Sequence, residues 1–121
     1  MSNGQRFDIC GMDEIADPGA KEFVLGEGQS AWYGFVVKKN GEVYAYANTC
    51  PHTGAMLNWA PDRFLTRAGD RIMCGVHGAI FEIETGFCEM GPCIGRSLRP
   101  MKVLVEDGKV VVIHDMPEPN Q

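Results

Sequence analysis

The sequence lacks long apolar runs, clusters of basic residues and any extended helical periodicity. No segment approaches the roughly 20 consecutive apolar residues that a membrane helix requires, and the polar N-terminus Met1–Arg6 does not resemble a signal-peptide core. The sequence has no cluster of Lys or Arg beyond the pair Lys38–Lys39, and its net charge is −5. Because nucleic-acid binding needs concentrated positive charge, that function class is excluded. We expect a cytoplasmic protein without nucleic-acid or membrane partners.

Turn-forming residues are abundant instead. The 15 glycines and 7 prolines are spread along the chain and separate short runs rich in Val, Ile, Phe and Tyr, which is typical of an all-β protein. We predict one domain over residues 1–115, built as an antiparallel β-sandwich or small barrel, followed by a frayed tail at 116–121. The expected extended segments are Arg6–Cys10, Glu22–Leu25, Ala31–Lys38, Glu42–Ala47, Arg63–Thr66, Arg71–Cys74, Ala79–Ile83, Met101–Glu106 and Lys109–Ile113.

Two dipeptides predict tight hairpins within this pattern. Asn40-Gly41 and Asp107-Gly108 each tolerate the positive φ angles of a type I′ turn, and each lies between two apolar runs. In the segment Glu42–Ala47, neither of the two alternating faces is strongly polar. We therefore expect both faces of that strand to be at least partly covered.

The five cysteines point to metal or redox chemistry, because cytosolic thiols stay reduced. Two of them begin short motifs, Cys50-Pro51-His52 and Cys74-Gly75-Val76-His77, with 21 residues between His52 and Cys74. Two thiolates and two imidazoles suit a tetrahedral zinc site or a mixed-ligand iron–sulfur cluster. Two buried thiols with two incidental histidines are the remaining alternative.

The order of the ligands favours the cluster over zinc. A zinc finger usually pairs its cysteines together and its histidines together along the chain, whereas each motif here carries one of each. A cluster held by two Cys on one iron and two His on the other needs two such matched loops.

These motifs resemble the Rieske family, and the resemblance extends from about residue 7 to residue 113. The residues that carry it are Cys50-Pro51-His52, Gly54, Cys74, His77-Gly78, Phe81, Thr85-Gly86, Gly91-Pro92, Leu98 and Asp107-Gly108. The resemblance implies a Rieske-like fold with two cluster-binding loops and a [2Fe–2S] cluster. It implies that Cys50 and Cys74 bind the buried iron, and that His52 and His77 bind the outer, solvent-facing iron.

Within the family the chain is most similar to the small ferredoxins that serve bacterial ring-hydroxylating oxygenases. This resemblance implies an electron carrier, without substrate turnover of its own, between a flavin-dependent reductase and a terminal oxygenase. Two alternatives stay open. One is a small subunit or accessory module of a larger oxidoreductase such as a nitrite reductase assembly, and the other is a zinc-stabilised binding module. A complete oxygenase is not expected, because 121 residues leave no room for a second catalytic domain.

The sequence departs from the family in two respects. The interval between the motifs is longer than usual, with the excess in 58–70, so we expect an unusual surface beside the cluster. Ala55 and Val76 stand where high-potential members carry bridging cysteines, and Ala79 and Phe81 stand where they carry Ser and Tyr. Since those hydrogen-bond donors are absent, we predict a reduction potential at the low end of the Rieske range, roughly −150 mV.

Other reactive or bulky side chains have simpler interpretations. Cys10, Cys88 and Cys93 are most simply small buried hydrophobes, although Cys88 and Cys93 are close enough in sequence to form a bridge. Trp59 is most simply a packing residue, with a docking surface as the alternative. His114 is expected at the surface rather than among the ligands.

Overall fold

The computed structural model describes residues 5–26, 28, 31–51, 54–75 and 78–114. The predicted tail 116–121 lies outside these residues, and the single domain over 1–115 stays a prediction. The described chain is nearly all β, as predicted, and it includes the short 3₁₀ turn Met12–Glu14. Within the described residues no helix is long and apolar enough to span a membrane.

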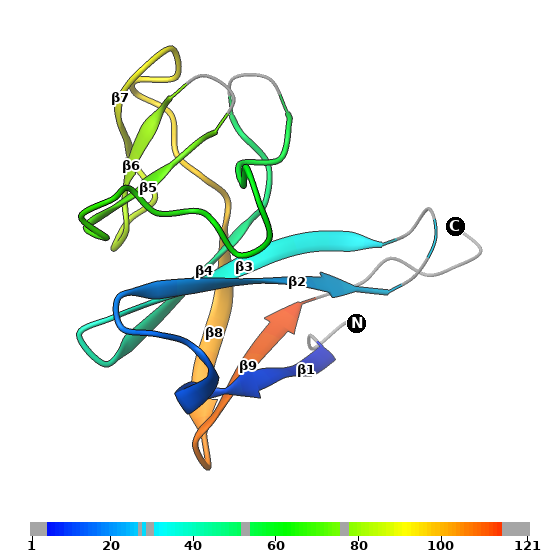
Figure 1. The fold of residues 1–121 in the computed structure, drawn as a ribbon. Coiled ribbons are helices and arrows are strands. Elements are labelled where there is room, and N and C mark those ends of the chain that lie inside the picture. Colours follow the sequence, from blue (N-terminus) through cyan, green and yellow to red (C-terminus); the bar gives the residue numbers. More distant parts are fainter. Residues whose placement is uncertain (1–4, 27, 29–30, 52–53, 76–77, 115–121) are drawn as a thin grey trace.

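The strands form a six-stranded antiparallel sheet in the order β1-β9-β8-β4-β3-β2 and a three-stranded sheet in the order β5-β6-β7. Figure 1 shows the large sheet curling into an open half-barrel, with the small sheet above one face. The strands are β1 Gln5–Gly11, β2 Gly19–Leu25, β3 Trp32–Lys39, β4 Glu42–Ala47, β5 Arg71–Met73, β6 Ile80–Glu82, β7 Cys88–Met90, β8 Pro100–Glu106 and β9 Lys109–His114.

Both predicted hairpin turns are confirmed. Asn40 and Gly41 have φ angles of 54° and 80°, and Asp107 and Gly108 have φ angles of 54° and 75°. Positive φ at both central residues matches the twist of the flanking strands. The Asp17 carboxylate also accepts hydrogen bonds from the backbone N–H groups of Asn40 and Gly41, both at 2.8 Å. These turns fix the registers of β3 with β4 and of β8 with β9.

Strand alternation places a separate core on each face of the large sheet. Phe35 and Val37 of β3 belong to the core beneath the small sheet, whereas Val36 belongs to the core inside the curl. In β4, Tyr46 likewise belongs to the core beneath the small sheet and Ala45 to the core inside the curl. The expectation that both faces of this strand are covered is confirmed.

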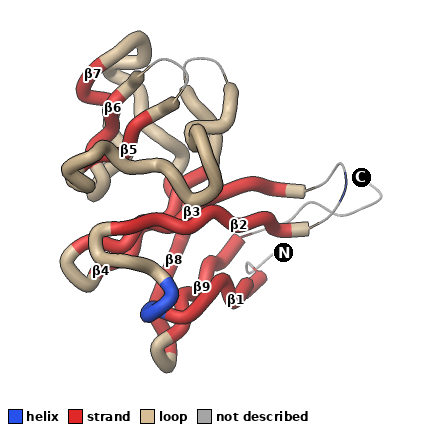
Figure 2. Tube along the Cα trace, viewed as in Figure 1, coloured by secondary structure: helices blue, strands red, loops and turns tan. Residues whose placement is uncertain are grey.

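The small sheet belongs to a long insertion between β4 and β8, residues 48–99, which we call the cap. The chain leaves the large sheet after Ala47 and returns at Arg99, and the Ala47 N–H donates to the Arg99 carbonyl at 2.9 Å. Much of the cap is loop rather than strand (Figure 2). Strand β7 was not predicted, and of the expected segment Arg63–Thr66 only Leu65 pairs, through an isolated bridge to Ile72.

One buried hydrogen bond joins the large sheet to the cap. The hydroxyl of Tyr46, which is 3% exposed, donates to the Ile83 carbonyl at 2.6 Å. Burial, followed by the nearby charge of Glu84, raises the pKa of Tyr46 from 10 to about 12. The neutral phenol is therefore the form that the folded protein requires.

A Tyr46→Phe variant is expected to be less stable at pH 8 by about 1–3 kcal/mol, because the Ile83 carbonyl loses its buried partner. Tyr46 holds its proton more tightly when folded, so its contribution is complete below pH 10 and is lost as pH rises through about 12. The gap between wild type and variant should therefore shrink over that range. Thermal unfolding of both proteins from pH 8 to pH 11.5 checks this, and a constant gap would contradict it.

Candidate metal centre

The two predicted ligand loops, which begin at Cys50 and Cys74, are closed by the same pair of backbone hydrogen bonds. In each loop the cysteine N–H donates to the carbonyl five residues further on, at 2.8 Å from Cys50 and 2.9 Å from Cys74. In each loop the N–H of the glycine four residues further on, Gly54 or Gly78, donates back to the cysteine carbonyl, at 2.8 and 2.9 Å. The described residues therefore close the two loops in an equivalent way.

The backbone conformation of the glycine four residues after each cysteine favours glycine at that position. Gly54 and Gly78 have φ angles of +80° and +70°, which lie in the left-handed region that residues with a Cβ rarely adopt. A Cβ at either position would meet nothing within 4 Å. Substitution is consequently opposed by backbone conformation and not by crowding.

Gly78→Ala should destabilise the protein by about 1–2 kcal/mol, the usual cost of the left-handed conformation for an L-residue. Gly78→Asn should lose less, because asparagine visits this region several times more readily than most residues. The midpoint of thermal unfolding separates the two, at about 4 °C per kcal/mol for 121 residues with an unfolding entropy of about 2.1 cal/mol/K per residue. Equal losses for Ala and Asn would contradict the conformational explanation.

The side chains of Cys50 and Cys74 point into the core beneath the cap. Cys50 is 1% exposed and Cys74 is fully buried, and both belong to the cluster that contains Phe64 and Phe81. The two loops are also joined directly, because the Gly75 N–H donates to the Leu57 carbonyl at 2.8 Å. Two water-shielded thiols from equivalent, connected loops are what a thiolate-ligated iron requires.

The predicted histidine ligands, His52 and His77, lie outside the described residues. Within the part of the chain that is described, no group of three or more His, Cys, Asp or Glu side chains is arranged to hold a metal ion. The structure thus places the cysteine half of the predicted ligand set.

A polar network that the sequence interpretation missed holds the first loop closed. Asn48, 5% exposed, accepts a hydrogen bond from the Leu57 N–H at 2.8 Å and donates to the Asn58 side-chain oxygen at 2.9 Å. Asn58 donates in turn to Glu22 of β2 at 3.2 Å. The Glu22 carboxylate also accepts from the Asp62 N–H, and the Asp62 carboxylate from the Glu22 N–H. The one local feature of the sequence that indicates this network is Asn48, an amide side chain at the end of an apolar strand.

The end of β7 and the loop after it, residues 89–97, which we call the third loop, lie against the first ligand loop. Arg96 donates from Nη1 to the Pro51 carbonyl at 2.9 Å. Cys93 is 2% exposed, and its Sγ lies 2.8 Å from the Sγ of fully buried Cys88. Burial, then the hydrogen bond and charge of Cys88 and the charge of Cys50, raise the pKa of Cys93 to about 12. The predicted burial of Cys88 and Cys93 is confirmed, while Cys10 is only half-buried.

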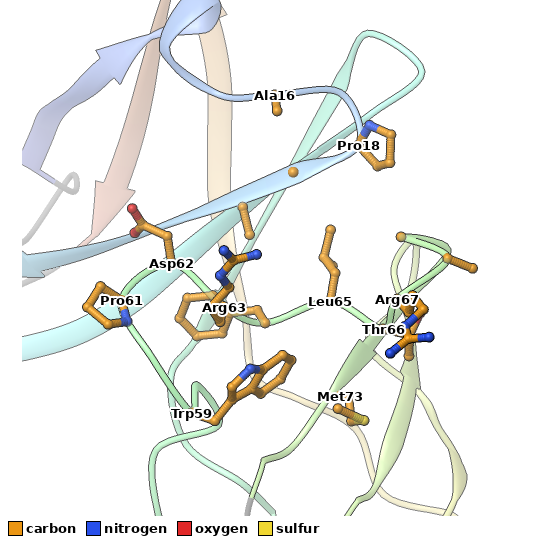
Figure 3. Close-up of a pocket in the computed structure, with 15 residues that line it drawn as sticks. Ala16, Pro18, Trp59, Pro61, Asp62, Arg63, Leu65, Thr66, Arg67 and Met73 are labelled. Atoms are coloured by element: carbon orange, nitrogen blue, oxygen red, sulfur yellow. The ribbon is translucent and has the colours of Figure 1, made fainter.

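Residues of the interval 58–70 form one wall of a groove (Figure 3), which is also lined by Met73, the residue before the second ligand loop. The groove has a volume of about 860 Å³, and its opposite wall is the start of β2 with Ala16 and Pro18. Trp59, 45% exposed, lies between the groove and that loop, since a Cβ on Gly75 would come within 2.8 Å of the Trp59 Cβ. Trp59 is therefore partly a packing residue and partly exposed surface.

Comparison with known proteins identifies the family. The model of the Rieske [2Fe-2S] domain matches residues 5–105. The chain belongs to the Rieske [2Fe–2S] domain family. It therefore carries a [2Fe–2S] cluster, and the two buried thiols of Cys50 and Cys74 fit that cofactor because iron–sulfur clusters are held by thiolates.

Relatives of this Rieske chain differ widely in length. It is 36% identical over 104 residues to human apoptosis-inducing factor 3, covering 86% of the chain but only 16% of that protein. Among solved structures, a ferredoxin from Sphingomonas yanoikuyae B1 is 27% identical with a TM-score of 0.66, covering 93% of this chain and all of that one.

Two further solved structures share the Rieske fold at lower identity. The ferredoxin of carbazole 1,9a-dioxygenase from Nocardioides aromaticivorans IC177 has a TM-score of 0.72 at 22% identity, covering 92% of this chain and 99% of that one. A putative nitrite reductase small subunit from Mycobacterium tuberculosis has a TM-score of 0.70 at 17% identity, covering 96% and 100%.

Proposed function

We propose that this Rieske protein is a ferredoxin that carries one electron from a flavin-dependent reductase to a terminal oxygenase. The observation that carries the proposal is the pair of buried cysteines in two equivalent loops at one end of a ferredoxin-like fold. The match to the Sphingomonas ferredoxin supports it, because that match extends over the whole of the ferredoxin and nearly all of this chain. Cysteine usage favours a cytoplasmic setting.

The proposed ligands are Cys50 and Cys74 on the inner iron and His52 and His77 on the outer iron. The burial of both cysteines supports the inner assignment. The spacing of the two histidines within the equivalent loops supports the outer assignment, because each follows its cysteine by two or three residues.

The chain's own residues have three tasks in this function. When bound, the cluster supplies a site that gains and loses a single electron. Cys50 and Cys74 bind it from the core side, and the apolar residues around them exclude water. Asn48 and Arg96 hold the first loop in place through their contacts with Leu57 and Pro51. No substrate pocket is needed for such a role.

The reduction potential is expected near the low end of the Rieske range, roughly −150 mV. Ala79 and Phe81 are fully buried in the core that contains Cys74, so neither position offers a hydroxyl to the cluster sulfurs. Redox titration followed by electron spin resonance measures the potential. A value above about +100 mV would contradict this prediction.

Exposed apolar side chains on the cap support a protein partner. Met56 and Trp59 are each 45% exposed, and Met90 and Ile94 are 61% and 64% exposed. All four follow a ligand loop or belong to the third loop. Apolar side chains of this kind form the buried centre of protein interfaces.

The function is tested with protein purified without oxygen. It should be red-brown, take up one electron per chain from dithionite and give the spin resonance signal of mixed His/Cys ligation. The reduced protein should then pass its electron to the oxygenase component of carbazole 1,9a-dioxygenase, used as a probe. A colourless, zinc-containing protein would overturn the proposal. Stable co-purification with a large subunit would instead favour an accessory subunit of a larger oxidoreductase.

A further inference from the structure

Cys88 and Cys93 form a second pair of buried thiols that the proposed ligand set does not use. Cys88 is the first residue of β7, and Cys93 lies in the third loop. Their Sγ atoms are 2.8 Å apart, and the two side chains are 0% and 2% exposed. Closing a disulfide of about 2.0 Å from this separation needs only a small change in the two side chains.

The backbone brings the two cysteines together independently of their side chains. The Cys88 N–H donates to the Arg96 carbonyl at 2.8 Å, and the Arg96 N–H donates to the Cys93 carbonyl at 2.9 Å. The chain from β7 to Arg96 is thus a closed loop, with Cys93 folded back over Cys88.

Cys93 is also the anchor of this loop. Within residues 89–97 it alone is buried, while every other residue is exposed. A loop with a single buried side chain and few hydrogen bonds to the rest of the protein can lift and close at low cost compared with a core segment. Lifting Cys93 would bring both sulfurs within reach of a small reagent.

We propose that Cys88 and Cys93 are a modification site, a reversible disulfide formed by exchange with a low-molecular-weight disulfide. Two cysteine S–H bonds break and one S–S bond forms between Cys88 and Cys93. The S–S bond of the reagent accepts the two electrons and two protons and leaves as two thiols.

The bridge would act on the cluster end of the molecule. The loop that it closes contacts the first ligand loop through Arg96 and Pro51. It also approaches the second loop, because a Cβ on Gly91 would lie 2.8 Å from the Ala79 Cα. Oxidation would therefore fix the loop that contacts both halves of the site.

The test maps the linkage in wild-type holoprotein. One sample is incubated with oxidised glutathione and another with dithiothreitol, and both are quenched in acid and then alkylated in denaturant. Digestion with trypsin and Glu-C places Cys88 in the fragment Thr85–Glu89 and Cys93 in Met90–Arg96. Mass spectrometry should find these fragments linked after glutathione and separate after dithiothreitol.

Three results would overturn the proposal: both fragments alkylated after oxidised glutathione, either fragment carrying glutathione alone, or linkage to the fragment with Cys74. Cys93→Ala should abolish the linked pair and Cys10→Ala should preserve it. Because the linkage is read by mass, it can be scored whether or not the protein retains visible cluster absorption. A failed ligand assignment therefore stays distinguishable from a failed bridge.

Discussion

Cys74→Ala is expected to purify with at least about tenfold less iron and acid-labile sulfide than the wild type. Losing even an outer partner of a metal site costs about 10–100-fold in affinity, and Cys74 is a proposed direct ligand. Its side chain is fully buried in the core, so no other group from solvent can take its place. Iron and sulfide analysis and the visible absorption spectrum measure the loss.

The matched control is Cys93→Ala. Cys93 belongs to the same buried cluster as Cys50 and Cys74, and its replacement removes the same atoms from the same core. It should nevertheless keep its full complement of iron, because it is not among the proposed ligands. If Cys93→Ala lost the cluster and Cys74→Ala kept it, the ligand assignment would be wrong.

Phe64→Ala should lower stability by about 3–5 kcal/mol, the usual cost of deleting a buried phenylalanine. Phe64 of the cap is fully buried and stacks on Phe35 of β3, with ring centroids 4.2 Å apart and an interplanar angle of 7°. This stack joins the cap to the large sheet. For a domain of this size the loss corresponds to a fall of more than about 12 °C in the thermal midpoint.

Phe87→Ala provides the comparison, since it makes the same chemical change on the same cap. Phe87 is 44% exposed, so its replacement should cost no more than about 1 kcal/mol. Circular dichroism in the far ultraviolet follows both transitions. Similar shifts for the two variants would show that the Phe35–Phe64 stack has no special role.

The large sheet was predictable because its signals are local. Asn40-Gly41 and Asp107-Gly108 fix two hairpins by their φ preferences alone, and the alternation in β4 predicts that both faces are covered. Strand β7 was missed because Glu89 and Met90 are exposed and only Cys88 is buried, which leaves no alternating pattern.

Candidate site residues can be predicted from the sequence only where they belong to a motif. The motif spacing predicts Cys50 and Cys74 as ligands, the structure buries both, and their role as ligands stays a prediction. The contacts that hold their loops join residues far apart in sequence, such as Glu22 with Asp62 and Arg96 with Pro51. Such pairs leave no local signal, because either residue alone is an ordinary surface side chain.

The way in which the cap enters the large sheet has a consequence for how such proteins diversify. The cap starts after Ala47 and ends at Arg99, and a single hydrogen bond of 2.9 Å joins these two positions. Because the entry and exit points are adjacent, residues can be inserted or removed between them without shifting the pairing of any strand of the large sheet. A cap with another cofactor preference or partner surface could therefore be grafted onto the same six strands. Recombination or protein design could in this way exchange the cap as one unit.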